Sequence, residues 1–367
     1  MGEYQYQIRR AEVGDASGLG ELAKAGFRGY PFTMVYEPPS LAKAIADGEH
    51  RIVALLEPDL QRIIGTAVLG IEGYMAEVKR VIVSPEYRRN GLAEAMTKKL
   101  VADASRLNVH PYSDTRADQI GMQKASLRSG LNAISVETGK HVVFYHEDSD
   151  HNPLGPARES MIHMTSLKAK PESLYSGLKK WSPDVTKILI ENMKRAYHEP
   201  KEKSKKISQK HLPSAQEVRE QIHQRLDESK NDFSVLHDEQ DVTVVQRGNI
   251  KMTIVKPDAS GFIETNSDTT KEELDYILTL SESIGLQIVT SYENADDLEK
   301  VSLMNECGLT PSMIRPWQTQ ADGDPQWQVG FRKTMNEYNN CLHHIRIDHD
   351  VRQQLEDFAV GLEQNVL

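Results

Sequence analysis

Two arginines, an asparagine and a glycine stand together in residues 88–93, Arg-Arg-Asn-Gly-Leu-Ala. A β-branched run ends just before them at Val83, and apolar residues spaced four apart from Leu92 predict a helix directly after them. A strand–turn–helix of this kind aims free backbone N–H groups, the positive end of a helix dipole and two guanidinium groups at one point. The chemistry that this stretch predicts is the binding of a pyrophosphate.

A second chemical feature is the carboxylate of Glu77, near the start of the same strand. Alternation along a strand places four residues on one face, Glu77, Lys79, Val81 and Val83. A carboxylate at the edge of a cleft can accept a proton, directly or through water. A solvated or ion-paired glutamate beside Lys79 or Arg80 agrees equally well with the sequence.

The composition narrows the classes of function. The chain has 367 residues and a net charge of −10, which argues against a general binder of nucleic acid or of anionic membranes. Its two cysteines form no CxxC pair, so a reducing cytoplasm is the expected location. No apolar run approaches the roughly 18 residues of a membrane span, and no signal peptide is recognised. His343 and His344 fit a solvated tail better than a ligand set, so no metal site is predicted.

The order of predicted elements divides the chain into four parts. Residues 1–168 give the order β-α-α-β-β-β-α-β-α-β-β, which is a mixed α/β domain. Residues 169–213 predict a helical and polar linker, and residues 214–335 a second, smaller α/β domain. Residues 336–367 predict a C-terminal helical tail.

The second domain echoes the first. A strand that ends in Tyr112 is followed by a helix and by Gly130-Leu131, and Tyr292 is followed in the same way by Gly308-Leu309. Each segment is preceded by a strand, a helix and a strand, which indicates two copies of one fold. Residues 264–270, which stand where the basic turn would be, contain two acidic residues and neither arginine nor glycine. We therefore expect the second copy to pack against the first or to form one wall of a substrate cleft, without binding a pyrophosphate.

The first domain resembles the GNAT superfamily of acyl-CoA-dependent N-acyltransferases. Residues 88–93 match the Arg/Gln-x-x-Gly-x-Gly/Ala signature of that family, and they follow a strand that ends Val83-Ser84-Pro85. The resemblance covers about residues 5–168, and the whole chain is similar to proteins that pair such a domain with a degenerate second copy. It implies a GNAT-like mixed α/β fold, with a second GNAT-like domain that lacks the CoA turn.

The resemblance also implies a co-substrate, acetyl-CoA, and no metal. In that family the signature strand hydrogen-bonds the pantetheine arm, and the turn amides take the pyrophosphate. Gly91 would permit close approach of the backbone to the ligand. Carried over position by position, the expected CoA-binding residues are Val81, Ile82, Val83, Arg88, Arg89, Asn90, Gly91, Leu92 and Ala93.

For catalysis, the resemblance places Glu77 at the position of a general base and a strand amide near Val83 as the oxyanion donor. Members of the family commonly carry a tyrosine at the position held here by Ser126, and that tyrosine protonates the leaving thiolate. Serine is a poor acid, so the acid is Ser126, Tyr145, Tyr112, a water molecule or no side chain at all. The catalytic candidates are therefore Glu77, Tyr145 and Ser126.

The leading hypothesis is direct transfer of an acyl group, most simply acetyl, from CoA to an amine of a small molecule or an amino acid. Tandem copies of this fold also occur in aminoacyl-tRNA-dependent transferases, although the intact CoA turn argues against that reading. A CoA-binding regulatory protein is a third, non-catalytic hypothesis. The acceptor would be defined by residues 27–36, residues 147–158 and the second domain, and a homodimer is left open. No nucleic-acid or membrane partner is expected.

Overall fold

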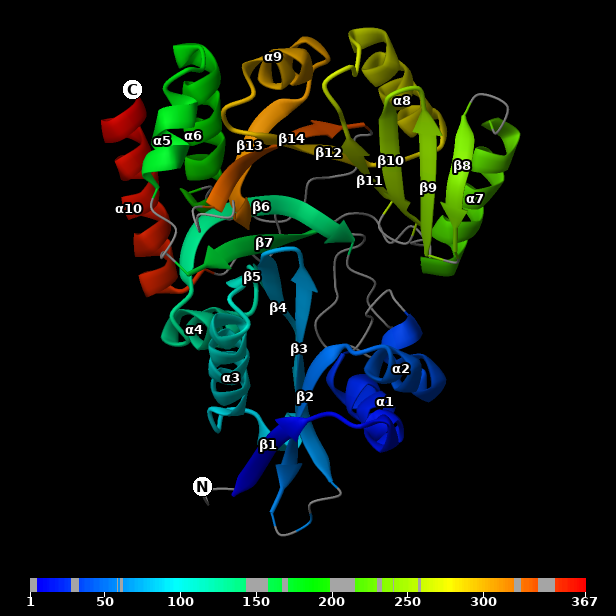
Figure 1. Ribbon diagram of the computed structural model, residues 1–367, viewed down its shortest axis with the longest axis vertical. Coiled ribbons are helices and arrows are strands. Elements are labelled where there is room, and N and C mark those ends of the chain that lie inside the picture. Colours follow the sequence, from blue (N-terminus) through cyan, green and yellow to red (C-terminus); the bar gives the residue numbers. More distant parts are fainter. Residues whose placement is uncertain are drawn as a thin grey trace, which may run out of the picture.

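The computed structural model describes residues 5–27, 33–57, 59, 62–142, 158–166, 171–198, 215–229, 233–239, 241–256, 259–319, 325–335 and 347–367. Two seven-stranded mixed sheets form the body of the molecule, and helices cover them (Figure 1). The predicted mixed α/β fold with a second domain is therefore confirmed. No described helix is both long enough and apolar enough to span a bilayer.

The first sheet has the order β1-β2-β3-β4-β5-β7-β6. Its only parallel neighbours among the described strands are β4 and β5, which are connected by a helix. Its strands are β1 (Tyr6–Arg10), β2 (His50–Leu56), β3 (Ile63–Glu72), β4 (Met75–Val83), β5 (His110–Arg116), β6 (Asn132–Val142) and β7 (Arg158–Thr165). Its helices are α1 (Ala16–Gly26), α2 (Pro38–Ala46), α3 (Leu92–Arg106) and α4 (Ile120–Arg128).

The second sheet repeats this strand order. It runs β8-β9-β10-β11-β12-β14-β13, and its one described parallel pair, β11 and β12, is again connected by a helix. The strands are β8 (Ser234–Asp238), β9 (Val242–Arg247), β10 (Ile250–Val255), β11 (Ser260–Glu264), β12 (Ile288–Asn294), β13 (Thr310–Thr319) and β14 (Pro325–Thr334). Helix α7 (Ala215–Ser229) precedes the sheet, and α8 (Lys271–Ser283) and α9 (Leu298–Glu306) connect its strands.

The two sheets meet along β6 and β13, and three helices cover the junction (Figure 1). The Ser135 hydroxyl of β6 donates to the carbonyl of Ile314 in β13 at 2.6 Å, and Ile134 belongs to the hydrophobic core of the second sheet. Helices α5 (Glu172–Leu178), α6 (Pro183–His198) and α10 (His349–Val366) come from the predicted linker and tail. These segments therefore join the two halves into one packed body.

Three strands differ from what the sequence predicts. For the tenth element of the predicted order, the pattern of residues 141–146 predicts a strand, but these residues overlap only the end of β6, which begins at Asn132; residues 143–146 lie outside the described part. β8 and β13 were not predicted. β13 carries Pro311 and Pro316, which read as breakers, but it is an edge strand, where a missing N–H is tolerated.

Candidate active site

The parallel strands β4 and β5 separate soon after they meet. Their register consists of Met75–His110, Ala76–Pro111 and Glu77–Tyr112, and the pairing stops there. From Val78 onward β4 has no ladder partner on this side among the described strands, whereas β5 continues against β7. The gap leaves peptide groups of β4 able to hydrogen-bond an extended ligand.

An irregularity in β4 lies at the mouth of this gap. On β3, Thr66 and Val68 are two residues apart, but their partners Ile82 and Lys79 are three apart, so β4 carries an extra residue. Arg80, at this bulge, has a φ of 51°, which lies in the left-handed region, and its guanidinium donates to Glu49 at 3.1 Å. The extra residue is unpaired in the ladder and can offer a backbone N–H to an oxyanion. This is earlier in the strand than Val83, where the donor was expected.

The turn before α3 has the geometry of an anion site. Gly91 is the N-cap residue with a φ of 74°, and no side chain in the described part of the chain caps the helix. The first intrahelical bond shown is Ala95 N–H to the Gly91 carbonyl at 2.9 Å, so the N–H groups of Leu92, Ala93 and Glu94 lie free of the helix ladder. The space that a Cβ atom at Gly91 would occupy is empty to beyond 4 Å.

The polar side chains of the turn differ in whether they hydrogen-bond nearby backbone carbonyls or extend into solvent. Arg88 folds back, donating from Nε to the Val83 carbonyl and from Nη2 to the Gly26 carbonyl, each at 3.2 Å. Asn90 donates to backbone carbonyls of the same turn. Arg89 is exposed and makes no ion pair with a described residue. Arg88 and Asn90 therefore shape the turn, and Arg89 has a guanidinium that can reach a phosphate.

A cavity of about 1000 Å³ begins at the gap and extends to the second sheet. Strands β4, β5 and β7 line one side, and β11, β12, β13 and β14 line the other. Glu77 and Tyr112 face it from the first half, and Tyr292 and Arg315 from the second. The second half therefore forms a wall of the same cavity.

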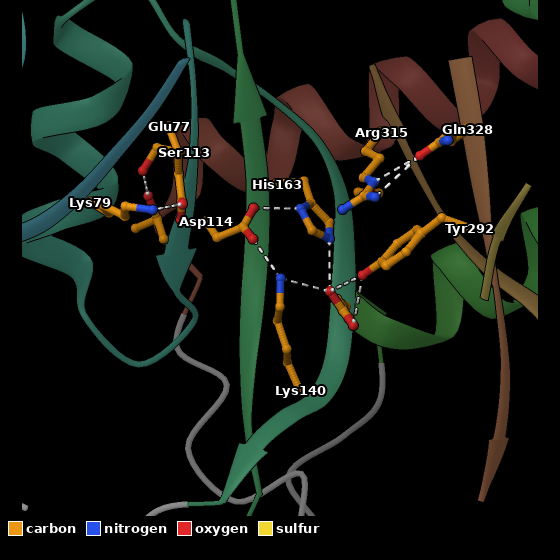
Figure 2. A network of polar contacts seen from close by, with 12 residues as sticks. Glu77, Lys79, Ser113, Asp114, Lys140, His163, Tyr292, Arg315 and Gln328 are labelled. Carbon is orange, nitrogen blue, oxygen red and sulfur yellow. Dashed lines mark hydrogen bonds and ion pairs between the residues drawn. The ribbon is translucent and has the colours of Figure 1, made fainter. Parts of the chain in front are cut away.

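Glu77 and Tyr112, partners in the register, form the reactive corner of this cavity. Glu77 accepts a hydrogen bond from Lys79 at 3.0 Å and remains partly exposed (Figure 2). Burial, together with the charges of Glu77 and Asp114, raises the pKa of Tyr112 far above its usual value. The phenol therefore stays protonated at neutral pH, where it can donate a hydrogen bond.

The other two catalytic candidates are placed differently. Ser126 is completely buried on α4, and its hydroxyl lies 3.2 Å from that of Thr115, which lines the cavity. Ser126 therefore lies behind the cavity wall. Tyr145 and most of the predicted acceptor loop at residues 147–158 lie outside the described residues.

A buried ionic network that the sequence did not predict lies beside the cavity (Figure 2). Asp114 contacts His163 at 2.6 Å and Lys140 at 2.5 Å. Glu137 contacts Lys140 and His163, each at 3.1 Å, and Arg332 of the second half at 2.6 Å. Because Glu137 binds cations from both halves, it is an ionic link between the two sheets.

The ion pairs of this network determine the protonation states of its two carboxylates and of its histidine. Burial alone would raise the pKa of the Asp114 and Glu137 carboxyls, but the surrounding cations outweigh burial and hold both pKa values well below the usual range. Burial alone would lower the pKa of His163, but Asp114 and Glu137 raise it. Both carboxylates are therefore ionised at neutral pH, and a charged imidazolium is favoured.

The equivalent turn in the second half is closed by its own side chains. Thr270 caps α8 by accepting from the Glu273 N–H at 3.2 Å, and Glu273 accepts in return from the Thr270 N–H at 2.9 Å. Glu273 also accepts from the Asn249 N–H at 3.0 Å. The Thr270 and Glu273 amides therefore have side-chain partners, and the Glu273 carboxylate lies at the turn where a phosphate would bind, in line with the acidic sequence of this turn.

Residues 19–129 match the acetyltransferase (GNAT) family model. This span contains β4, the separated strands, the α3 turn and Glu77. The first half of the chain therefore contains a GNAT acetyltransferase domain. No curated protein matches the sequence.

Within the described residues, no group of three or more histidine, cysteine or acidic side chains is arranged to hold a metal ion.

Solved structures similar to this chain include several acetyltransferases. The ribosomal-protein-S18-alanine N-acetyltransferase of Escherichia coli is 15% identical, with a TM-score of 0.35, over 44% of this chain and 93% of that one. A spermidine N-acetyltransferase of Vibrio cholerae is 18% identical, with a TM-score of 0.35, over 44% and 92%. The protein yncA of Salmonella typhimurium, solved with acetyl-CoA, is 17% identical, with a TM-score of 0.36, over 44% and 92%.

Proposed function

We propose that this protein is an acyl-CoA-dependent N-acyltransferase that transfers an acyl group, most simply acetyl, directly to an amine of a small molecule or amino acid. The observation that carries the proposal is the gap between β4 and β5, which opens beside the uncapped N-terminus of α3. The gap suits a pantetheine arm, which hydrogen-bonds like an extended peptide, and the helix terminus suits a pyrophosphate. A pantetheine arm bound in this gap would bring its thioester toward the carboxylate of Glu77, where the strand pairing ends.

The residues of this corner match the needs of acyl transfer. The amine nitrogen forms a bond to the thioester carbonyl carbon, and the carbon–sulfur bond breaks. The proton lost by the amine passes to Glu77, directly or through water. An N–H of the bulge at Arg80 stabilises the oxyanion. Tyr112 donates a hydrogen bond to the leaving thiolate, and a water molecule gives the thiolate its proton.

The test measures binding and turnover separately on the full-length protein. Calorimetry with acetyl-CoA measures binding, and release of free thiol in the presence of a panel of amines measures turnover. We expect micromolar binding and thiol release that depends on the amine. Binding without turnover on any amine would favour the CoA-binding regulatory alternative. Transfer from charged tRNA, without a requirement for CoA, would favour the aminoacyl-tRNA-dependent alternative.

A further inference from the structure

The second half places one arginine in the cavity in a fixed position. The guanidinium carbon of Arg315, on β13, lies 3.4 Å from the ring centroid of Tyr292 and 4.4 Å from that of Trp317. Its Nε and Nη2 atoms donate to the Gln328 side-chain oxygen at 3.3 Å and 3.1 Å (Figure 2). Two ring contacts and an amide therefore hold this cation before any ligand arrives.

Arg315 also differs from its neighbours in having no carboxylate partner among the described residues. Arg80, Arg116 and Arg332 are each paired with a glutamate. The Nη1 atom of Arg315 has no acceptor in the described part of the chain, and the side chain lines the cavity. A half-buried, immobilised guanidinium without a counter-ion is suited to bind a planar carboxylate from a ligand.

Arg315 lines the same cavity as the reactive corner formed by Glu77 and Tyr112. Burial raises the pKa of the Tyr112 hydroxyl, the charge of Glu77 raises it further, and the charge of Arg315 lowers it, so both charges act on this phenol. Glu77 is contributed by the first half and Arg315 by the second, and both line one cavity. One small molecule can therefore present an amine to Glu77 and an anionic group to Arg315.

We propose that Arg315 binds a carboxylate of the acceptor, so that the acceptor is an amino acid or another amine that bears a carboxylate. Tyr292, Trp317 and Gln328 hold the guanidinium in place for that contact. This inference rests on the proposed N-acyltransferase function and names its substrate class. It also gives the second half a role, because the residue that selects the acceptor lies there.

The test compares acceptors that differ only in the carboxylate. Each amino acid of a panel is assayed against its amide and its decarboxylated amine, with acetyl-CoA and the full-length protein. We expect kcat/KM to be about 10- to 100-fold higher for the acids, which is the range of a charge-assisted bidentate contact. Arg315→Met should remove this preference mainly through KM, and Arg315→Lys should restore part of it.

A matched control is available in the same half. Arg247 stacks on Tyr276 with the same 3.4 Å separation but does not line the cavity. Arg247→Met should therefore leave the preference for acids unchanged. The inference is overturned if the wild-type protein does not prefer acids, or if Arg315→Met lowers turnover of acids and amides by the same factor.

The two proposals can fail separately. If no amine is acetylated although acetyl-CoA binds, the proposed function fails. Binding of the same amino acids is then measured by calorimetry with wild-type protein and with Arg315→Met. Binding that is lost only in the variant supports the carboxylate site, and absence of binding to the wild-type protein overturns it.

Discussion

The two halves of this molecule have the same strand order, but they differ at their central parallel strands and at the start of the helix that connects those strands. In the first half, β4 and β5 pair over three residues and then separate. In the second half, four of the five residues of β11 pair with β12, so no such gap opens. Helix α3 begins at an uncapped glycine, whereas α8 begins with a complete capping box. The first half therefore has the open strand edge and uncapped helix that would suit an extended phosphorylated ligand, and the described residues of the second half have neither.

This comparison shows that strand order alone does not make the site. Two local features decide it, namely how far the central parallel strands stay paired and what satisfies the amides at the start of the helix. The half without these features contributes side chains instead, with Tyr292 and Arg315 facing the shared cavity. One copy thus holds the proposed donor site, and the other forms the wall opposite.

The largest expected effect concerns the link between the halves. The Glu137 side chain is fully buried and contacts Lys140, His163 and Arg332. Glu137→Gln removes its negative charge from these three cations. We expect a loss of about 3–5 kcal/mol of unfolding free energy, because buried cations lose their partner. Chemical denaturation of the full-length protein measures it.

The control is a buried carboxylate of the second sheet that has no ion pair among the described residues. Burial raises the pKa of Glu293, and Ser291 and Thr265 donate hydrogen bonds to it. Glu293→Gln should therefore cost less than about 1 kcal/mol. Equal losses in the two variants would contradict the special role of Glu137.

The next effect compares two glutamates at the same place in the two folds. Glu77 is paired with Tyr112, and Glu264 and Tyr292 are the residues that directly follow the last pair of β11 and β12. Glu77→Gln should lower kcat about 100- to 1000-fold without weakening acetyl-CoA binding, since it removes the general base. Steady-state kinetics and calorimetry measure the two quantities.

Glu264→Gln should change kcat by less than about threefold, as for an ordinary exposed substitution. Comparable losses in the two variants would mean that both halves supply catalytic groups. An unchanged kcat in Glu77→Gln would show that the base is elsewhere.

The local parts of the site were predictable from the sequence. The α3 turn is encoded within six residues by a glycine and its neighbours, so its position between a strand and a helix could be predicted before the structure was known. The bulge at Arg80 could not, because it depends on pairing with β3 and occurs without a glycine. It also breaks the strict alternation that was assumed along β4.

The groups that join the halves were not predictable, and the reason is physical. Asp114, Glu137 and Lys140 lie on strands where polar residues normally indicate a solvent face, but here that face is covered by a second copy of the fold. Arg315 was missed because its strand contains two prolines. Its partners Tyr292 and Gln328 come from other strands, so no spacing along the chain connects them.

A smaller effect tests the two helix termini. Gly91→Asp should weaken acetyl-CoA binding about 100-fold, or roughly 2.7 kcal/mol, by placing a negative charge where the pyrophosphate would bind. Aspartate tolerates the left-handed conformation better than most residues, so the fold should survive. Thr270→Asp makes the same change at the N-cap of α8 and should leave binding unchanged. Calorimetry would contradict the comparison if both variants bound acetyl-CoA equally.

The smallest effect is the pH dependence of the junction. Asp114 and Glu137 raise the pKa of His163 above that of an unfolded histidine, about 6.5. The stability that the imidazolium contributes is therefore complete below about pH 6.5 and is lost as pH rises through the folded pKa, by up to about 1.4 kcal/mol per pH unit. Denaturation midpoints between pH 6.5 and 8.5 should fall in the wild-type protein. They should stay level in His163→Asn, although that variant is less stable throughout.

The control is a histidine of the second half, His223, whose side chain is 53% exposed. His223→Asn should keep the wild-type slope of the denaturation midpoint against pH. A slope that survives in His163→Asn would assign the titration to another group.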